Sequence, residues 1–133
     1  MYFAGISDEA GQDLESQIRA HRELDWEYLE PRNIGDQCIT DLSDADFESA
    51  IGKLSDAGLK IVGFASQLAN WARPIDNDFQ VDIDELNRAI PRMQQTGAKF
   101  IRCMSYPNSQ ENPFSESAWG DEVVRRFKTL AKT

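Results

Sequence analysis

A short apolar run followed by an amphipathic stretch recurs four times along the chain, and this pattern limits the possible folds most strongly. The four apolar runs are Tyr2–Ile6, Trp26–Leu29, Lys60–Ala65 and Phe100–Met104. Such alternation is typical of strands that alternate with helices. Because a helical crossover returns the chain to the same edge of a sheet in the same direction, we expect four parallel strands with right-handed connections.

Each amphipathic stretch carries apolar residues at helical spacing, which predicts a helix with one buried face. The four sets are Leu14, Ile18, His21 and Leu24; Phe47, Ala50, Ile51 and Leu54; Leu86, Ile90 and Met93; and Trp119, Val123, Phe127 and Leu130. No low-complexity segment or linker interrupts the pattern, so we expect one domain over residues 1–133.

Several residues mark the predicted ends of these helices. Ser43, with Asp46 three residues later, resembles a capping box at a helix start. Gly58 and Gly97 are suited to end their helices in the left-handed conformation. Pro91 conflicts with the third helix, since a proline inside a helix removes one backbone hydrogen bond, so we expect a kink or a late start there.

Two α/β folds fit this order of elements: a small doubly wound sheet, and a parallel (β/α)4 half of a TIM barrel. A doubly wound sheet is covered by helices on both faces and requires nearly continuous apolar strands. In this chain Glu30 and Arg32 lie two residues apart at the end of the second strand, and Arg102 lies within the fourth. Charged groups there favour the barrel half, because a barrel mouth offers a polar cavity and partners.

The excess of acidic over basic residues limits the kinds of partner that the chain can bind. The chain has 23 acidic and 14 basic residues, a net charge of −9, which argues against nucleic-acid binding. Its apolar runs are too short to cross a membrane, and the acidic start does not resemble a signal peptide. We therefore expect a cytoplasmic protein with no membrane partner, in which Cys38 and Cys103 are reduced thiols.

The sequence lacks the common cofactor and catalytic motifs. Dinucleotide, P-loop, hydrolase and zincin signatures are absent. The acidic stretch Asp76–Asp84 fails as a calcium loop, because Val81 stands where the turn needs glycine and Asn87 stands where a glutamate should bind. We expect this stretch to be a solvated loop.

The pattern as a whole resembles a known family. The segments GISDE, YLEPRNI, ITDLSDADFESAIGKLSDAGLKIVGFAS and GAKFIRCMSYP resemble the amino-terminal half of the xylose isomerase-like TIM-barrel family of sugar phosphate isomerases and epimerases. The resemblance covers nearly the whole chain as an order of elements. Glu30 with Arg32, the DLSD segment, the Gly58–Lys60 turn and Arg102 carry it.

The resemblance implies an enzyme that transfers a proton next to a sugar carbonyl with the help of a divalent metal such as Mn, Mg, Zn or Co. In this family the metal ligands lie at the ends of the last four strands, which this chain lacks. His21, the one histidine, lies on a predicted helix and cannot replace them. We therefore expect half an enzyme that holds no metal and is inactive alone. The DNA-endonuclease branch of the same fold conflicts with the net charge and the absent zinc ligands.

Six residues at predicted strand ends are candidates for binding a sugar or sugar-phosphate substrate: Glu30, Arg32, Arg102, Glu9, Ser66 and Tyr106. Each also has a structural interpretation. The charged residues at the second and fourth strands would form an ion pair, and we expect Glu30 to lie within salt-bridge distance of Arg102. Glu9, with Asp8, would favour the positive end of the first helix, and Ser66 and Tyr106 would be ordinary loop residues.

A second function stays open at this point. A half barrel leaves its first and fourth strands as unpaired edges, which favours pairing with a second copy or with a missing half. The chain would then be a non-catalytic interaction module.

Overall fold

The computed structural model describes every residue from Met1 to Thr133. By its contacts the chain divides into two compact units, one formed by Met1–Ser66 with Ala89–Arg102 and the other by Gln67–Arg88 with Cys103–Thr133. The expectation of a single domain over residues 1–133 stays a prediction. No helix of the chain is long and apolar enough to cross a membrane.

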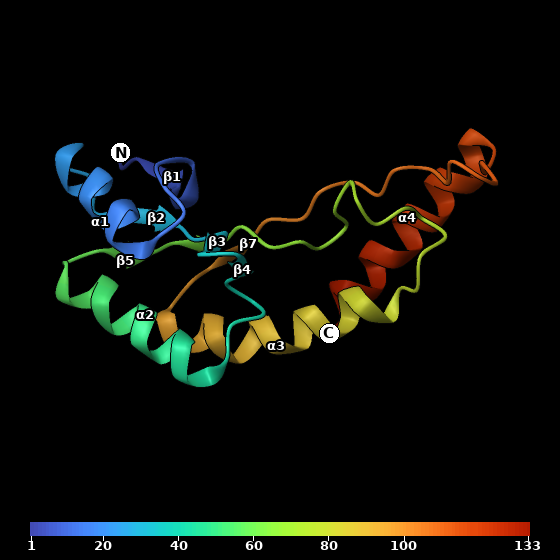
Figure 1. Ribbon diagram of the computed structural model, residues 1–133. Coiled ribbons are helices and arrows are strands. Elements are labelled where there is room, and N and C mark those ends of the chain that lie inside the picture. Colours follow the sequence, from blue (N-terminus) through green and yellow to red (C-terminus); the bar gives the residue numbers. More distant parts are fainter. The chain divides into compact units, whose positions relative to one another are not determined.

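The first unit contains the predicted parallel strands (Figure 1). Strand β1 (Ala4–Ile6) pairs with β2 (Tyr28–Glu30), and β2 pairs with β5 (Lys60–Ile61). Strand β6 (Gly63–Phe64) then pairs with β7 (Phe100–Ile101). All these pairs are parallel, which confirms the prediction of parallel strands joined by helices.

The third apolar run is divided at Val62. Ile61 and Phe64 both belong to the apolar core, although residues three apart in a regular strand point to opposite faces. The strand therefore bends between β5 and β6. Gly63 lets β6 approach β7 closely, because a Cβ atom there would lie 2.8 Å from the carbonyl oxygen of Phe100.

Helices cover one face of this sheet. Helix α1 (Leu14–Glu23) contributes Leu14 and Ile18 to the core, and α2 (Asp44–Asp56) contributes Phe47, Ala50 and Leu54. Helix α3 (Gln80–Thr96) adds Ala89 and Met93. These side chains pack against Leu29, Ile61, Phe64 and Ile101. Glu30, at the end of β2, therefore points to the other face, and so does Arg102, which directly follows β7 and does not lie within the strand as expected.

The predicted helix ends are confirmed. Ser43 caps α2 by accepting a hydrogen bond from the Asp46 amide at 3.1 Å. Gly58 and Gly97 follow α2 and α3 with φ of +78° and +72°, the left-handed conformation that suits glycine. Of the two alternatives at Pro91, the late start is wrong, because α3 begins at Gln80 and contains Pro91; the kink stays a prediction.

A small hairpin follows the second strand. Strands β3 (Asn33–Ile34) and β4 (Gln37–Cys38) pair antiparallel, with Gly35 at φ +65° in the turn. This pair lies outside the parallel strands and does not change their direction. The hairpin gives the segment after β2 a fixed shape.

The second unit is built around helix α4 (Glu116–Leu130). Its residues Trp119, Val123 and Phe127 pack against Ile75 and Tyr106, as their spacing predicts. The expectation that residues Asp76–Asp84 form a solvated loop is wrong in its last part. Helix α3 begins at Gln80, and Asp82 is 2% exposed, because its carboxylate is neutralised by Arg73 at 2.5 Å.

Candidate functional site

The carboxyl ends of β1 and β2 bring together a group of charged side chains. The short 3₁₀ turn η1 (Ser7–Glu9) follows β1, and Arg32 follows β2. Arg32 Nε donates to both Asp8 carboxylate oxygens, at 2.9 and 3.1 Å, and its Nη2 donates to Glu9 Oε1 at 2.7 Å. Asn33 Nδ2 also donates to Asp8, at 2.8 Å. The candidates Arg32 and Glu9 are thus joined through one guanidinium group.

The two carboxylates that Arg32 binds differ in their exposure to solvent. The side chain of Asp8 is 6% exposed, whereas that of Glu9 is 68% exposed. The hydrogen bonds that Arg32 donates to the Asp8 carboxylate raise the pKa of Arg32, which keeps the guanidinium charged. Asp8 is therefore a buried structural partner of Arg32, and Glu9 is a surface partner with oxygen atoms in reach of solvent. Neither residue caps α1, because Asp13 accepts the hydrogen bond from the Ser16 amide.

A buried glutamine fixes the loop that carries this charged group. Gln17 is 0% exposed, and its side-chain amide donates to the backbone oxygens of Gly11, Gln12 and Asn33 at 2.9–3.1 Å. Its Oε1 accepts a hydrogen bond from Ser7 Oγ at 2.6 Å. Helix α1 thereby ties the segments after β1 and β2 together.

Glu30 and Arg102 do not form the expected ion pair. Both point away from the helices, since Leu29 and Ile101 beside them pack into the core. However, Nε and Nη2 of Arg102 are buried and have no hydrogen-bond partner. The expectation failed because β5 and β6 lie between their strands, β2 and β7, so the two side chains start too far apart across the sheet.

Ser66 and Tyr106 are both buried and engaged. Ser66 is 1% exposed, and its hydroxyl donates to the backbone oxygen of Arg102 at 2.7 Å. Tyr106, in the second unit, is 1% exposed and donates its hydroxyl hydrogen bond to Asp82 at 2.5 Å. Burial, together with the charge of Asp82, raises the pKa of Tyr106. Their roles in substrate binding stay predictions.

A buried network surrounds Asp82 in the second unit. Arg73 Nη1 donates to Asp82 and to Glu85 at 2.5 and 2.6 Å, and the Gln67 amide donates to Glu85 at 2.8 Å. Partial desolvation of the Cys103 thiol, together with the charges of these two carboxylates, raises the pKa of Cys103, although the residue reaches the surface. Arg73 balances one of the two carboxylate charges, and hydrogen bonds from the Gln67 amide and the Tyr106 hydroxyl stabilise the remaining negative charge, so the network joins the two loops to the start of α3.

The side chains of this chain do not form a metal centre. Three or more carboxylate, imidazole or thiolate ligands are the usual minimum for a protein metal site, and no such group of His, Cys, Asp and Glu occurs here. Asp8 and Glu9, the acidic residues at a strand end, are instead bound to Arg32. A metal therefore does not fit the residues present.

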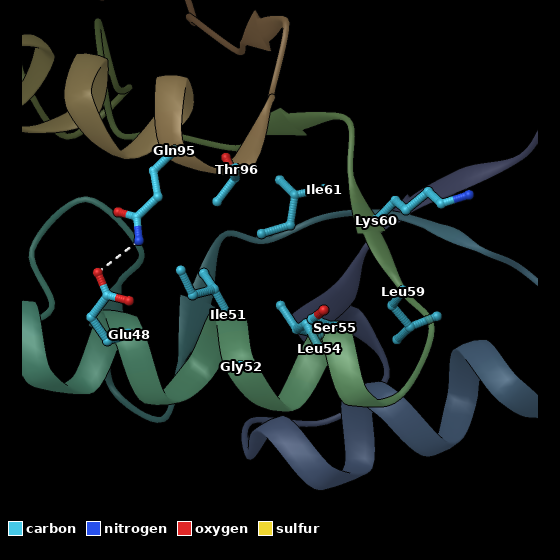
Figure 2. A pocket seen from close by; sticks show the side chains of 10 residues that line it. All are labelled: Glu48, Ile51, Gly52, Leu54, Ser55, Leu59, Lys60, Ile61, Gln95 and Thr96. Atoms are coloured by element: carbon cyan, nitrogen blue, oxygen red, sulfur yellow. Dashed lines mark hydrogen bonds between the residues drawn. The ribbon is translucent and has the colours of Figure 1, made fainter.

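One groove of the first unit, about 470 Å³ in volume, lies away from the strand ends. Figure 2 shows it between α2 and the end of α3, beside β5, with apolar walls from Ile51, Leu54 and Ile61. Gln95 donates a hydrogen bond to Glu48 across it at 2.7 Å. The groove lies on the helix-covered side of the sheet and so is separate from the charged group at β1 and β2.

Sequence reasoning named Asp8 beside Glu9 but missed its pairing with Arg32, and it missed Asn33 altogether; a signal existed for each. Asp8 follows β1 at the level where Arg32 follows β2, and neighbouring parallel strands bring such residues together. Asn33 stands next to Arg32 in a turn-rich segment. By contrast, no sequence signal identifies Arg92, which is buried in α3 and donates to the carbonyl oxygens of Ile39 and Leu42.

Comparisons with known proteins support the fold. No protein-family model and no curated protein matches the chain. Among solved structures, the chain is similar to a xylose isomerase-like TIM barrel protein from Mycobacterium smegmatis crystallised in complex with magnesium, with a TM-score of 0.63 and 18% sequence identity. The similarity covers 97% of this chain and 49% of that chain, so this chain spans about half the length of its structural neighbour. The chain therefore has the fold of half a TIM barrel, similar to that of a xylose isomerase-like protein.

Proposed function

We propose that this chain is the amino-terminal half of a sugar or sugar-phosphate isomerase or epimerase of the xylose isomerase-like kind. The observation that carries the proposal is the parallel order of β1, β2, β5/β6 and β7, together with the similarity over 97% of this chain and 49% of the neighbour. A TIM barrel places its active site at the carboxyl ends of its strands. The charged group of Asp8, Glu9 and Arg32 lies at this end of β1 and β2.

In the proposed enzyme this half supplies one wall of the substrate pocket. Glu30 and Arg102 point away from the helices, where the interior of a barrel lies. Glu9 presents exposed carboxylate oxygens that accept hydrogen bonds from sugar hydroxyls. Arg32, held by Asp8, keeps Glu9 in place, while Ser66 and Tyr106 support the loops after the third and fourth strands.

The reaction of the proposed enzyme is proton transfer at the carbon next to a carbonyl, and it needs groups that this chain lacks. Polarisation of the carbonyl by a divalent metal requires ligands from outside the chain, because no metal-binding group occurs within it. We therefore expect no turnover by this chain alone. The missing half, or a partner that replaces it, supplies the metal ligands.

The test is deuterium incorporation from D₂O into ketopentoses, ketohexoses and their phosphates, followed by proton NMR with Mg²⁺ or Mn²⁺ present. The chain alone is compared with the product of its gene extended through any segment encoded in frame after Thr133. Incorporation by the extended protein and none by the chain is the expected result. Incorporation by the chain alone, or none by an extended protein that has folded with bound metal, would contradict the proposal.

A second candidate function is a half-barrel module that pairs through its sheet edges, and exposed apolar side chains favour it. Met1, Tyr2 and Phe3 beside β1 and Phe100 in β7 are all more than half exposed. Edge strands with exposed apolar residues favour pairing with another chain. Sedimentation equilibrium distinguishes this function: it requires a dimer at micromolar concentration, and a monomer throughout would exclude self-pairing.

A further inference from the structure

Arg102 carries a charge that nothing in this chain compensates. It follows β7, and its Nε and Nη2 are both shielded from solvent without a hydrogen-bond partner. An arginine cannot lose its charge at any ordinary pH, so it cannot avoid the penalty by deprotonation. A buried donor without an acceptor is costly, and more so when it is charged.

The other shielded arginines of the chain show how unusual this is. Arg92 donates to two carbonyl oxygens and to Asp44 at 2.6–3.0 Å. Arg126 donates to two carbonyl oxygens and to Glu122 at 2.6–3.1 Å. Arg73 binds Asp82 and Glu85. Besides the two nitrogens of Arg102, the only buried side-chain atom without a partner is Nε2 of His21.

The two unpartnered atoms lie on one edge of the guanidinium plane. The N–H groups of Nε and Nη2 on this edge point in parallel, with the spacing of the two oxygens of a carboxylate or of a phosphate. Nη1 is not among the shielded unpartnered atoms, and Arg102 as a whole is only partly buried. The Nε–Nη2 edge itself is covered by neighbouring atoms of the chain, so a ligand reaches it only when these atoms move aside.

The chain itself offers no oxygen atom to this edge. Glu30 shares the face but is separated from Arg102 by the intervening strand. With a net charge of −9, the chain as a whole repels anions, so long-range electrostatic attraction does not bring them to this edge. An anion held here must be held by specific hydrogen bonds.

We propose that the Nε–Nη2 edge of Arg102 binds an anionic oxygen group, a carboxylate or a phosphate, on the concave face of the half barrel. If the group belongs to the substrate, which rests on the proposed function, the enzyme acts on sugar phosphates or sugar acids and not on neutral sugars. If it belongs to the protein, it is an acidic side chain of the strand that pairs with β7. Both sources supply the same two oxygens to the same edge.

The first test is binding to the chain at constant ionic strength, by calorimetric titration with inorganic phosphate, gluconate and neutral xylulose. The variants are Arg102→Met, which removes the donors, Arg102→Lys, which keeps the charge without the paired donors, and Arg22→Met, a control at an exposed arginine on α1. If the anionic group belongs to the substrate, phosphate or gluconate is expected to bind and xylulose is not. Both Arg102 variants are then expected to weaken binding at least tenfold, whereas Arg22→Met leaves it unchanged. Equal binding by the wild-type chain and Arg102→Met would overturn the proposal.

The second test separates the protein source. If no small anion binds, sedimentation equilibrium is expected to show pairing of the chain that Arg102→Met weakens at least tenfold and Arg22→Met leaves unchanged. If neither binding nor pairing depends on Arg102, the proposal is wrong. A further readout is the melting temperature. Because Arg102→Met removes an unsatisfied charge, this variant is expected to melt at the same temperature as the unliganded wild-type chain or at a higher one. A lower melting temperature of the variant would count against the proposal. Because these readouts are binding and stability, loss of the enzyme activity proposed above does not affect them.

Discussion

Replacing Arg32 by methionine tests whether the charged group at β1 and β2 is a structural element. The substitution keeps an unbranched apolar stem and removes the guanidinium with three hydrogen bonds, two to Asp8 and one to Glu9. The bond to Glu9 contributes little, because that carboxylate is 68% exposed and water replaces the lost partner, about 0.5 kcal/mol or less. The larger effect comes from Asp8, whose 6% exposed carboxylate keeps only the Asn33 amide as a side-chain partner.

The expected loss follows from these exposures. Breaking a fully buried ion pair costs about 3–5 kcal/mol, but Arg32 is 32% exposed, which lets water reach the site and lowers the cost to about 2 kcal/mol. Urea unfolding measures this loss. Arg22→Met removes an exposed arginine of the same chain and is expected to change stability by less than about 0.5 kcal/mol.

A double-mutant cycle identifies the partner. If Asp8 carries the effect, Asp8→Asn combined with Arg32→Met costs about 1 kcal/mol less than the sum of the single changes, because no carboxylate is left unpaired. An Arg32→Met variant as stable as Arg22→Met would refute the structural role and would leave Arg32 free for a ligand.

Three further substitutions test local features of the fold. Arg125 and Arg126 hold the pKa of Glu122 at about 2, so the stability that Glu122 adds is present above about pH 4.5 and is lost as the pH falls through 2. The difference in free energy of unfolding between wild type and Glu122→Gln should therefore shrink by about 1 kcal/mol from pH 7 to pH 2. A difference that stays constant with pH would argue against the ion pair. Gly63→Ala places a Cβ 2.8 Å from the Phe100 oxygen and should lower the free energy of unfolding in urea by about 2 kcal/mol. The control Gly52→Ala, in an uncrowded part of α2, should leave stability unchanged or raise it. Equal effects of the two substitutions would exclude the close approach. Asp25→Gly relieves a left-handed backbone, φ +54°, after α1 and should raise stability by about 1 kcal/mol, and a lower melting temperature would contradict this.

The sequence predicted the order and direction of the strands because both follow from local patterns. The spacing of Leu14 with Ile18 and of Phe47 with Leu54 assigned the helix faces, and these residues pack in the core. Ser43 and Gly58 act within a few residues of their own positions, so their roles were also predictable. Leu24, which the same spacing placed on the buried face of the first helix, is instead 56% exposed, because it lies at the C-cap where α1 ends.

Features that depend on distant residues were harder to predict. The burial of Asp82 depends on Arg73, which comes from a loop with no regular pattern. The hairpin of β3 and β4 is an exception: its turn signal, Gly35 followed by Asp36, is local, and the hairpin was nevertheless missed. The pairing of Arg32 with Asp8 could have been inferred once β1 and β2 were taken as neighbours. The lack of a partner for Arg102 could not, because it depends on the positions of all the hydrogen-bond acceptors around that side chain.

Amide hydrogen exchange across the parallel strands tests most directly whether the chain is an open half barrel. In a dilute solution of the chain, amides of the interior strands β2 and β5 are expected to exchange slowly, while β1 and β7 each retain unprotected amides along their outer edge. Those edge amides should become protected only when a second half or a second copy pairs with them. Full protection of β1 and β7 in a dilute monomer would show that the sheet has no open edges and would contradict the half-barrel proposal.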